Sequence, residues 1–193
     1  MKPRILITEH ISGAGIDLLS SDCECLIPWK DGRTSGDQVR SALYDVDAVL
    51  VRLFSVDAHD LQQTSRLKVI GKHGVGVDNI DCQAATQHGV AVVNTPLANS
   101  NAVAEHAVTS MLALARQLEH MSREMRAGRF DVRNDIRGIE VAGKSLGVVG
   151  LGRVGARVAQ IAAIGLGMTV YAFDPLVTDY AGPGTQVAIV GEL

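Results

Sequence analysis

Short apolar runs rich in β-branched residues alternate with amphipathic stretches along the chain. The runs are four to six residues long and nearly continuous in apolar character, which is typical of strands buried on both faces of a sheet. We predict strands at residues 5–8, 24–27, 48–52, 68–71, 90–94, 145–149 and 169–173, and helices at residues 13–20, 36–44, 57–64 and 80–88. This order predicts an α/β fold whose parallel strands are joined by right-handed crossovers.

The longest amphipathic stretch, residues 99–127, divides the chain. Its apolar side chains recur every three or four positions, at Val103, Ala107, Met111, Leu114, Leu118, Met121 and Met125. Asn99 offers a capping side chain at the start, and Gly128 offers a stop at the end. We therefore predict one long crossover helix between two domains, residues 1–98 with five strands and residues 99–193.

A glycine motif opens the helix that follows the predicted strand at 145–149. The motif is Gly150-Leu151-Gly152-Arg153-Val154-Gly155, and a second strand at 169–173 ends in Asp174. Strand, glycine turn, helix and strand in this order form the context in which such a motif binds a dinucleotide. Asp174 lies 24 residues after Gly150, close to the spacing at which a carboxylate accepts the ribose 2′-hydroxyl of NAD.

Each residue of this motif has a physical role. Gly150 permits the tight turn, Gly152 lets backbone N–H groups approach the pyrophosphate, and Gly155 lets the helix pack closely on the strand. Asp174 would repel a 2′-phosphate, so the motif favours NAD over NADP. The alternatives are a glycine turn without a ligand and, for Asp174, a turn residue before Pro175.

Composition and charge narrow the function classes. Of 193 residues, 18 are Lys or Arg and 21 are Asp or Glu, a formal net charge of −3, so we expect neither nucleic acid nor an acidic membrane surface as partner. No apolar run approaches the roughly 20 residues of a membrane-spanning helix. The N-terminal run is too short for a signal peptide.

The sequence has three cysteines, and an odd number argues against a disulfide framework, so we predict that they are small core residues in a reducing compartment. We therefore expect a cytoplasmic protein, and we assign no metal ligands.

Two loops of the first predicted domain add to the glycine motif. One is Lys68-Val69-Ile70-Gly71-Lys72-His73-Gly74-Val75-Gly76-Val77-Asp78-Asn79-Ile80-Asp81, and the other runs from Val92-Val93-Asn94-Thr95-Pro96 to Ala104-Glu105-His106. With the glycine motif and Asp174, these loops resemble the D-isomer-specific 2-hydroxyacid dehydrogenases, most closely their D-3-phosphoglycerate dehydrogenase-like branch. The resemblance covers essentially the whole chain.

The resemblance implies both a fold and an activity. The fold is a flavodoxin-like, parallel-sheet substrate-binding domain at residues 1–98, followed by an incomplete doubly wound Rossmann domain for NAD at residues 99–193. The activity is that of an oxidoreductase that moves a hydride between NAD and C2 of a small D-2-hydroxy or 2-oxo acid. The helix at residues 99–127 matches one that builds a homodimer interface in the family.

The resemblance also carries over site residues. Gly74, Val75 and Gly76 match a loop whose N–H groups bind the substrate carboxylate, with Val75 beside the nicotinamide. Arg52 matches an arginine that contacts substrate phosphate or carboxylate, although a surface charge is an equal alternative because the residues that follow it depart from the usual pattern. His73 is interpreted as a variation beside the substrate loop and not as the catalytic histidine.

In the second domain, Arg153 and Val154 match positions that contact the pyrophosphate. The family's substrate-polarising arginine, its acid/base histidine and the carboxylate that tunes the histidine come from later strands and loops, so no catalytic residue is assigned here. We expect only two of about six Rossmann strands, with residues 191–193 inside the next helix. The truncated chain should then lack turnover without a complementing C-terminal fragment. The alternative is a non-catalytic protein, either an NAD- or ADP-binding remnant or a dimerising interaction module.

Overall fold

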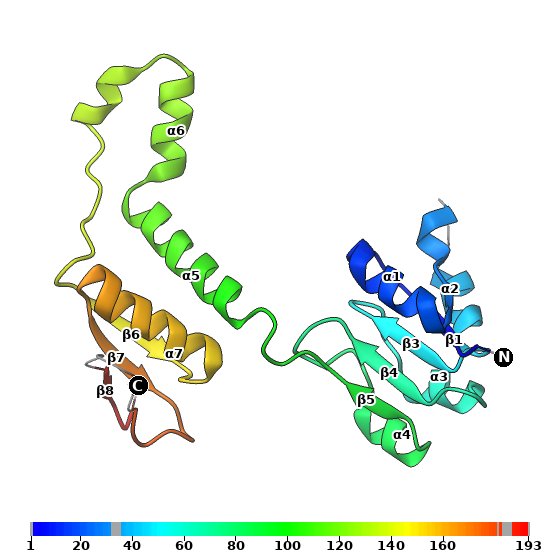
Figure 1. Ribbon diagram of the computed structural model, residues 1–193. Coiled ribbons are helices and arrows are strands. Elements are labelled where there is room, and N and C mark those ends of the chain that lie inside the picture. The colour runs from blue at the N-terminus through cyan, green and yellow to red at the C-terminus, as the bar shows by residue number, and fades with distance from the viewer. Residues whose placement is uncertain (1, 32–35, 181, 183–186, 193) are drawn as a thin grey trace. The chain divides into compact units, whose positions relative to one another are not determined.

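The computed structural model describes residues 2–31, 36–180, 182 and 187–192. By its internal contacts the chain separates into two compact units, Met1–Ala98 (unit 1) and Asn99–Leu193 (unit 2), and Figure 1 colours them from blue to green and from green to red. Both units are built from parallel strands and helices. The mixed α/β class predicted from the apolar pattern is therefore confirmed.

Unit 1 contains a five-stranded parallel sheet (Figure 1). Its order is β2-β1-β3-β4-β5, the order of a flavodoxin-like fold, as predicted. Each strand lies within two residues of its predicted ends, because a nearly continuous apolar run is what a strand covered on both faces requires. The strands are β1 (Arg4–Ile7), β2 (Glu24–Leu26), β3 (Ala48–Val51), β4 (Val69–Lys72) and β5 (Ala91–Val93).

Helices cover both faces of this sheet. Successive strand residues point to opposite faces, so Leu6 and Ile7, both fully buried, belong to different apolar clusters. Leu6 packs with residues of α2 (Gly36–Leu43), α3 (Ala58–Gln63) and α4 (Cys82–Gln87), whereas Ile7 packs with Ile16 of α1 (Gly13–Asp22). A short 3-10 helix, Pro28–Asp31, follows β2.

The prediction of a single helix at residues 99–127 is wrong, because this stretch forms two helices, α5 (Ser100–Ala115) and α6 (Leu118–Arg126). Gln117 adopts a left-handed conformation, with φ of 51°. The returning chain holds this break: the Ile139 N–H donates to the Ala115 carbonyl (2.6 Å), and Gln117 Nε2 donates to the Arg137 carbonyl (3.0 Å). The sequence has neither glycine nor proline at the break, so no local signal marks it.

Unit 2 contains three parallel strands, β6 (Ser145–Val149), β7 (Thr169–Phe173) and β8 (Val187–Ile189), in that spatial order. The expectation of only two strands is therefore wrong, and so is the expectation that the chain passes from β7 into a helix that holds its last residues. β8 pairs with β7, and its apolar residues pack against the unit 2 core, which a run of three residues does not reveal by itself.

One layer of helix covers a face of this second sheet. α7 (Arg153–Gln160) continues into a π-helical turn, Ile161–Gly165, and its Ala159 and Ala162 are fully buried against β6 and β7. Met111 of α5 joins the same cluster. Across the part of the chain that the structure describes, no helix is both long and apolar enough to traverse a bilayer.

Candidate functional site

The glycine turn of unit 2 has the close packing that its sequence predicts. Gly150 has a φ of +92°, and its N–H donates to the Phe173 carbonyl (2.8 Å), which ties the end of β6 to the end of β7. A Cβ on Gly155 would lie 1.9 Å from the Gly150 carbonyl oxygen, so only glycine fits there. A Cβ on Gly152 would meet no atom within 4 Å, which leaves room for a ligand to approach this backbone.

Asp174 lies directly after β7 and faces the glycine turn. Its Oδ2 accepts the Leu151 N–H (2.7 Å) and its Oδ1 accepts the Leu176 N–H (2.9 Å). The bond from Leu176, then that from Leu151, lowers the pKa of Asp174, so the carboxylate is charged at neutral pH. Each carboxylate oxygen has further acceptor capacity, which two ribose hydroxyls can use.

Arg153 and Val154 begin α7 directly after the turn. The preceding residue, Gly152, caps the helix with extended backbone and provides no side-chain hydrogen bond. The first N–H groups of a helix have no partner within it and carry a partial positive charge, a setting that suits a phosphate. The tight Gly150–Gly155 contact, the open space at Gly152 and the charged Asp174 together fit the adenosine half of a dinucleotide.

In unit 1, the loop from Gly74 to Gly76 is held at its carbonyl groups by residues that follow β5. The Gly74 carbonyl accepts the N–H (3.0 Å) and hydroxyl (3.1 Å) of Thr95, and the Val75 carbonyl accepts Asn94 Nδ2 (2.7 Å). The Gly74 N–H donates to the Lys72 carbonyl (2.9 Å). Among the described residues, no partner is found for the N–H groups of Val75 and Gly76, so these two can receive an anion.

Arg52 reaches the same edge of the sheet as that loop. It follows β3, and Val51 at the end of β3 pairs with Lys72 at the end of β4. The carboxyl ends of adjacent parallel strands therefore bring Arg52 and the Gly74–Gly76 loop side by side, at the edge where open α/β sheets bind ligands. The Arg52 side chain is exposed and forms no hydrogen bond or ion pair with the other described residues.

Sequence reasoning missed Glu9, Lys72 and Asn94, which also lie at the carboxyl edge of the unit 1 sheet. Lys72 Nζ donates to the Arg52 carbonyl (2.6 Å), and Glu9 accepts backbone N–H groups of the loop that begins at Arg52. A usable signal was present, because each of these polar residues ends a predicted strand or follows it within two positions.

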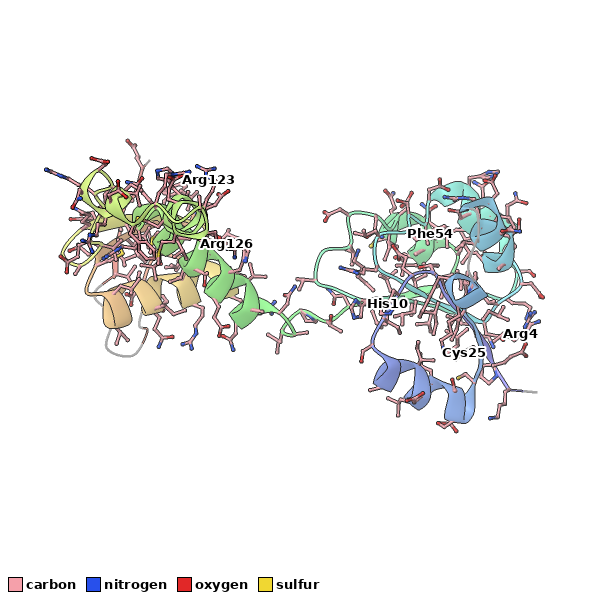
Figure 2. All side chains as sticks on the ribbon, turned by 90° about the horizontal axis from the view of Figure 1, so that it is seen from above. Arg4, His10, Cys25, Phe54, Arg123 and Arg126 are labelled. Carbon is pink, nitrogen blue, oxygen red and sulfur yellow. The ribbon has the colours of Figure 1, made fainter. Side chains whose placement is uncertain are left out.

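Aromatic residues also lie on these loops. Figure 2 labels His10, which follows Glu9, and Phe54, which ends the Arg52 loop. The His10 and Trp29 rings are 4.9 Å apart at their centroids. The Arg40 guanidinium lies over the Phe54 ring at 5.1 Å. These contacts pack the two loops against neighbouring residues of unit 1.

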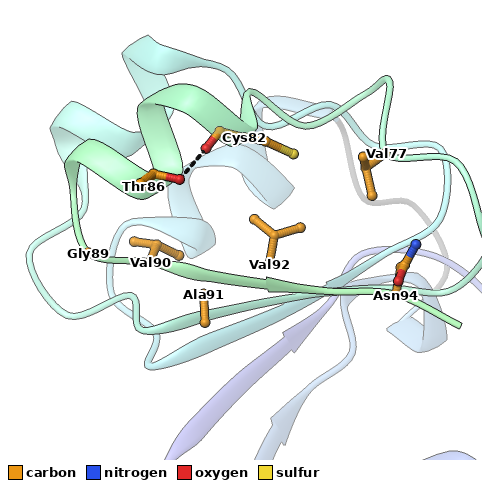
Figure 3. A pocket seen from close by; sticks show the side chains of 8 residues that line it. All are labelled: Val77, Cys82, Thr86, Gly89, Val90, Ala91, Val92 and Asn94. Atoms are coloured by element: carbon orange, nitrogen blue, oxygen red, sulfur yellow. Dashed lines mark hydrogen bonds between the residues drawn. The ribbon is translucent and has the colours of Figure 1, made fainter.

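A pocket of about 660 Å³ opens between α4 and β5 (Figure 3). Val92 points into it, and Asn94 and Val77 border it on the side of the Gly74–Gly76 loop. No charged side chain lines this pocket, so it does not suit the carboxylate of a small acid. Its lining comes from Val77, Cys82, Thr86, Gly89, Val90, Ala91, Val92 and Asn94.

Comparison with known proteins matches residues 5–185 to the model of the D-isomer specific 2-hydroxyacid dehydrogenase catalytic domain. The chain is 39% identical over 178 residues to D-3-phosphoglycerate dehydrogenase 2, chloroplastic, of Arabidopsis thaliana, covering 90% of this chain and 27% of that protein. It is 41% identical over 176 residues to D-3-phosphoglycerate dehydrogenase of Archaeoglobus fulgidus, covering 91% of this chain and 33% of that protein.

A solved structure is similar along nearly the same length. The NAD-dependent formate dehydrogenase of Staphylococcus aureus, crystallised with NAD, superposes with a TM-score of 0.78 at 26% identity, over 98% of this chain and 60% of that one. The chain spans only 27% and 33% of the lengths of the two curated relatives.

Proposed function

The chain belongs to the D-isomer specific 2-hydroxyacid dehydrogenase family, and from that premise we propose that it is part of an NAD-dependent oxidoreductase acting on the CH–OH group of a D-2-hydroxy acid. Unit 1 supplies the substrate-binding residues, and unit 2 supplies the first part of the NAD-binding domain. Bound NAD provides the nicotinamide ring that accepts the hydride from C2 of the substrate.

The observation that carries the proposal is the contact between Asp174 and the glycine turn. The Asp174 carboxylate accepts the Leu151 N–H at 2.7 Å, which fixes an acceptor for ribose hydroxyls next to the backbone that would receive the pyrophosphate. Gly152, Arg153 and Val154 would hold the pyrophosphate, while Gly150 and Gly155 would shape the cofactor-binding turn and pack α7 against β6. The charge of Asp174 opposes a 2′-phosphate, which favours NAD over NADP.

Calorimetric titration of the chain with NAD and with NADP tests the cofactor half. We expect NAD to bind more tightly. We expect Asp174→Asn, which removes the charge but keeps one acceptor oxygen, to reduce the preference for NAD by about tenfold. Asp179→Asn, on the exposed loop after Pro175, is the matched control and should leave the preference unchanged. An equal preference in the unaltered chain and in Asp174→Asn would contradict the assignment.

For the substrate half, we propose that Arg52 and the N–H groups of Val75 and Gly76 bind the carboxylate, with Val75 beside the nicotinamide. The exposed guanidinium lies at one sheet edge with the Val75 and Gly76 N–H groups, for which the described part of the chain offers no acceptor, and a carboxylate offers acceptor oxygens to both. In this family, hydride transfer also needs an acid/base histidine and an arginine from later parts of the coenzyme domain.

We therefore propose that these 193 residues bind ligands but do not turn over alone. Oxidation of NADH with glyoxylate and related 2-oxo acids should be undetectable at high protein concentration. Adding a complementing C-terminal fragment that carries the missing histidine and arginine should restore it. Robust turnover by the chain alone would contradict this proposal, whereas NAD binding that no fragment converts into turnover would favour a non-catalytic NAD-binding protein.

We further propose that the chain forms a homodimer through α5 and α6. Leu114 and Leu118 are 80% and 59% exposed on either side of the break at Gln117, and Met125 is also exposed. Such a row of exposed apolar side chains is typical of an interface. Sedimentation velocity should show a dimer that Leu114→Glu dissociates and Glu119→Gln does not; a monomer in the unaltered chain would contradict this.

We further propose that the protein is cytoplasmic. Cys23, Cys25 and Cys82 are free thiols, which suits a reducing compartment such as the cytoplasm.

A further inference from the structure

Three consecutive backbone N–H groups of the Arg52 loop converge on the carboxylate of Glu9. The Arg52 N–H donates to Glu9 Oε2 (2.6 Å), and the N–H groups of Leu53 and Phe54 donate to Glu9 Oε1 (2.7 and 3.0 Å). The Thr8 hydroxyl adds a fourth bond to Oε2 (2.9 Å). Successive N–H groups that point into one concavity form an anion-binding nest, and here the anion is the protein's own carboxylate.

The carbonyl groups of the same loop are held by two other side chains. Lys72 Nζ donates to the Arg52 carbonyl (2.6 Å), and Asn79 Nδ2 donates to the Phe54 carbonyl (2.6 Å). Lys72 Nζ also donates to Asn79 Oδ1, which joins the two side chains. Lys72 and Asn79 bracket the loop that contains Gly74 and Gly76, so both candidate carboxylate-binding segments belong to one hydrogen-bonded assembly.

This arrangement immobilises the backbone of Arg52 and leaves its side chain available. Both the N–H and the carbonyl of Arg52 have partners, whereas its exposed guanidinium has none among the described residues. The Glu9 carboxylate is charged at neutral pH and is a weak base. Burial raises the pKa of Glu9, but the bonds from the three N–H groups and Thr8 outweigh it and lower the pKa overall.

We propose that Glu9 is a positioning residue for substrate binding, because its carboxylate fixes the backbone of residues 52–54 and thereby directs the Arg52 guanidinium toward the anion held by the Val75 and Gly76 N–H groups. The inference rests on the proposed function of Arg52 and deepens it. Glu9 touches neither substrate nor cofactor and acts only through Arg52. Loss of Glu9 should therefore matter only while Arg52 is present.

A double-mutant cycle on the 193-residue chain tests this, with D-glycerate as the probe and its dissociation constant measured by NMR titration in the presence of NAD. We expect Arg52→Ala and Glu9→Gln each to raise the constant about tenfold, a loss equivalent to one charge-assisted hydrogen bond. The double variant should be no weaker than Arg52→Ala alone. Glu24→Gln, an exposed glutamate on β2, is the matched control and should bind as the unaltered chain does.

Amide hydrogen exchange separates positioning from general loss of structure. In Glu9→Gln, protection should fall at Arg52, Leu53 and Phe54 and remain at core amides such as that of Ile70. If Glu9→Gln unfolds unit 1, Glu9→Ala with sodium formate provides the second variant, because formate can enter the vacated nest and should restore protection at these three amides in a saturable manner.

The outcomes distinguish this inference from the function on which it rests. No D-glycerate binding by the unaltered chain, or none lost in Arg52→Ala, would overturn the proposed substrate site and this inference with it. Binding that Arg52→Ala weakens but Glu9→Gln does not would overturn this inference alone. Additive losses in the double variant would show that Glu9 acts independently of Arg52 and would also overturn it.

Discussion

Replacing Gly155 with alanine is the sharpest test of the packing at the glycine turn. The new Cβ would lie 1.9 Å from the Gly150 carbonyl oxygen and 3.3 Å from Val148 Cγ1. Because real Cβ contacts almost never fall below 3.0 Å, the oxygen must move by at least about 1 Å. That oxygen belongs to Gly150, whose N–H is held by the Phe173 carbonyl (2.8 Å), so the turn cannot move without disturbing the contact between β6 and β7.

The magnitude follows from two opposing effects. Overpacking of a close contact costs typically 1–3 kcal/mol, and we place a backbone clash at about 3 kcal/mol. Alanine in place of glycine within a helix returns about 1 kcal/mol. We therefore expect unit 2 to lose about 2 kcal/mol of unfolding free energy, which lowers its urea midpoint by about 1 M.

Urea unfolding followed by two probes measures this loss. The one tryptophan in the sequence, Trp29, lies in unit 1, so its fluorescence reports that unit, whereas far-UV circular dichroism reports both. Gly155→Ala should shift the dichroism transition assigned to unit 2 and leave the Trp29 transition in place. Gly165→Ala, whose Cβ would meet no atom within 4 Å, is the control and should destabilise nothing. A Gly155→Ala chain as stable as the Gly165→Ala chain would refute the reasoning.

Three further changes have expected outcomes in urea unfolding. The pKa of Glu9 in the folded chain lies below its unfolded value of about 4.3. The charged carboxylate therefore contributes fully to the free energy of unfolding above about pH 4.3, and this contribution is lost as the pH falls through the folded pKa. Glu9→Gln should be less stable than the unaltered chain at pH 7, and the difference should shrink below about pH 4. Asp60→Ala should lower the free energy of unfolding by about 2–4 kcal/mol, because Asp60 is 0% exposed, pairs with Arg40 and accepts the Tyr44 hydroxyl. This range is already reduced because Arg40 is partly exposed to solvent. A loss below about 1 kcal/mol would contradict the prediction. Gln117→Gly loses the hydrogen bond from Nε2 to the Arg137 carbonyl, about 1 kcal/mol, but relieves a left-handed non-glycine residue by a similar amount, so its stability should stay within about 0.5 kcal/mol of the unaltered chain. Gln117→Ala loses the same bond without that relief and should cost about 1 kcal/mol.

Parallel strands were predictable because their signal is local. A run such as residues 145–149 is apolar on both faces, and the strand Ser145–Val149 has the predicted bounds. The roles of Gly150 and Gly155 were also predictable, because a positive φ and a close contact with backbone each demand glycine. β8 has only three residues and is held by its pairing with β7, so its existence depends on a neighbour that the local pattern does not contain.

The candidate site shows the same division. Arg52 and the Gly74–Gly76 loop could be proposed from their resemblance to motifs of the family, and a glycine-rich turn also suits an anion by its residue type. Their arrangement could not, because Glu9 holds the Arg52 loop from one distant segment of the chain and Lys72 and Asn79 hold it from another. Likewise, the break at Gln117 depends on the distant Ile139 N–H, which competes for the Ala115 carbonyl at the end of α5.

The sequence by itself therefore determined the elements whose cause lies within a few residues: apolar strands, obligatory glycines and the charged residue at a strand end. Tertiary structure decided where those elements stop and how their polar groups are shared. The physical reason is that buried apolar area follows the side-chain pattern of each segment, whereas a backbone hydrogen bond can be satisfied by any segment that folding brings within about 3 Å.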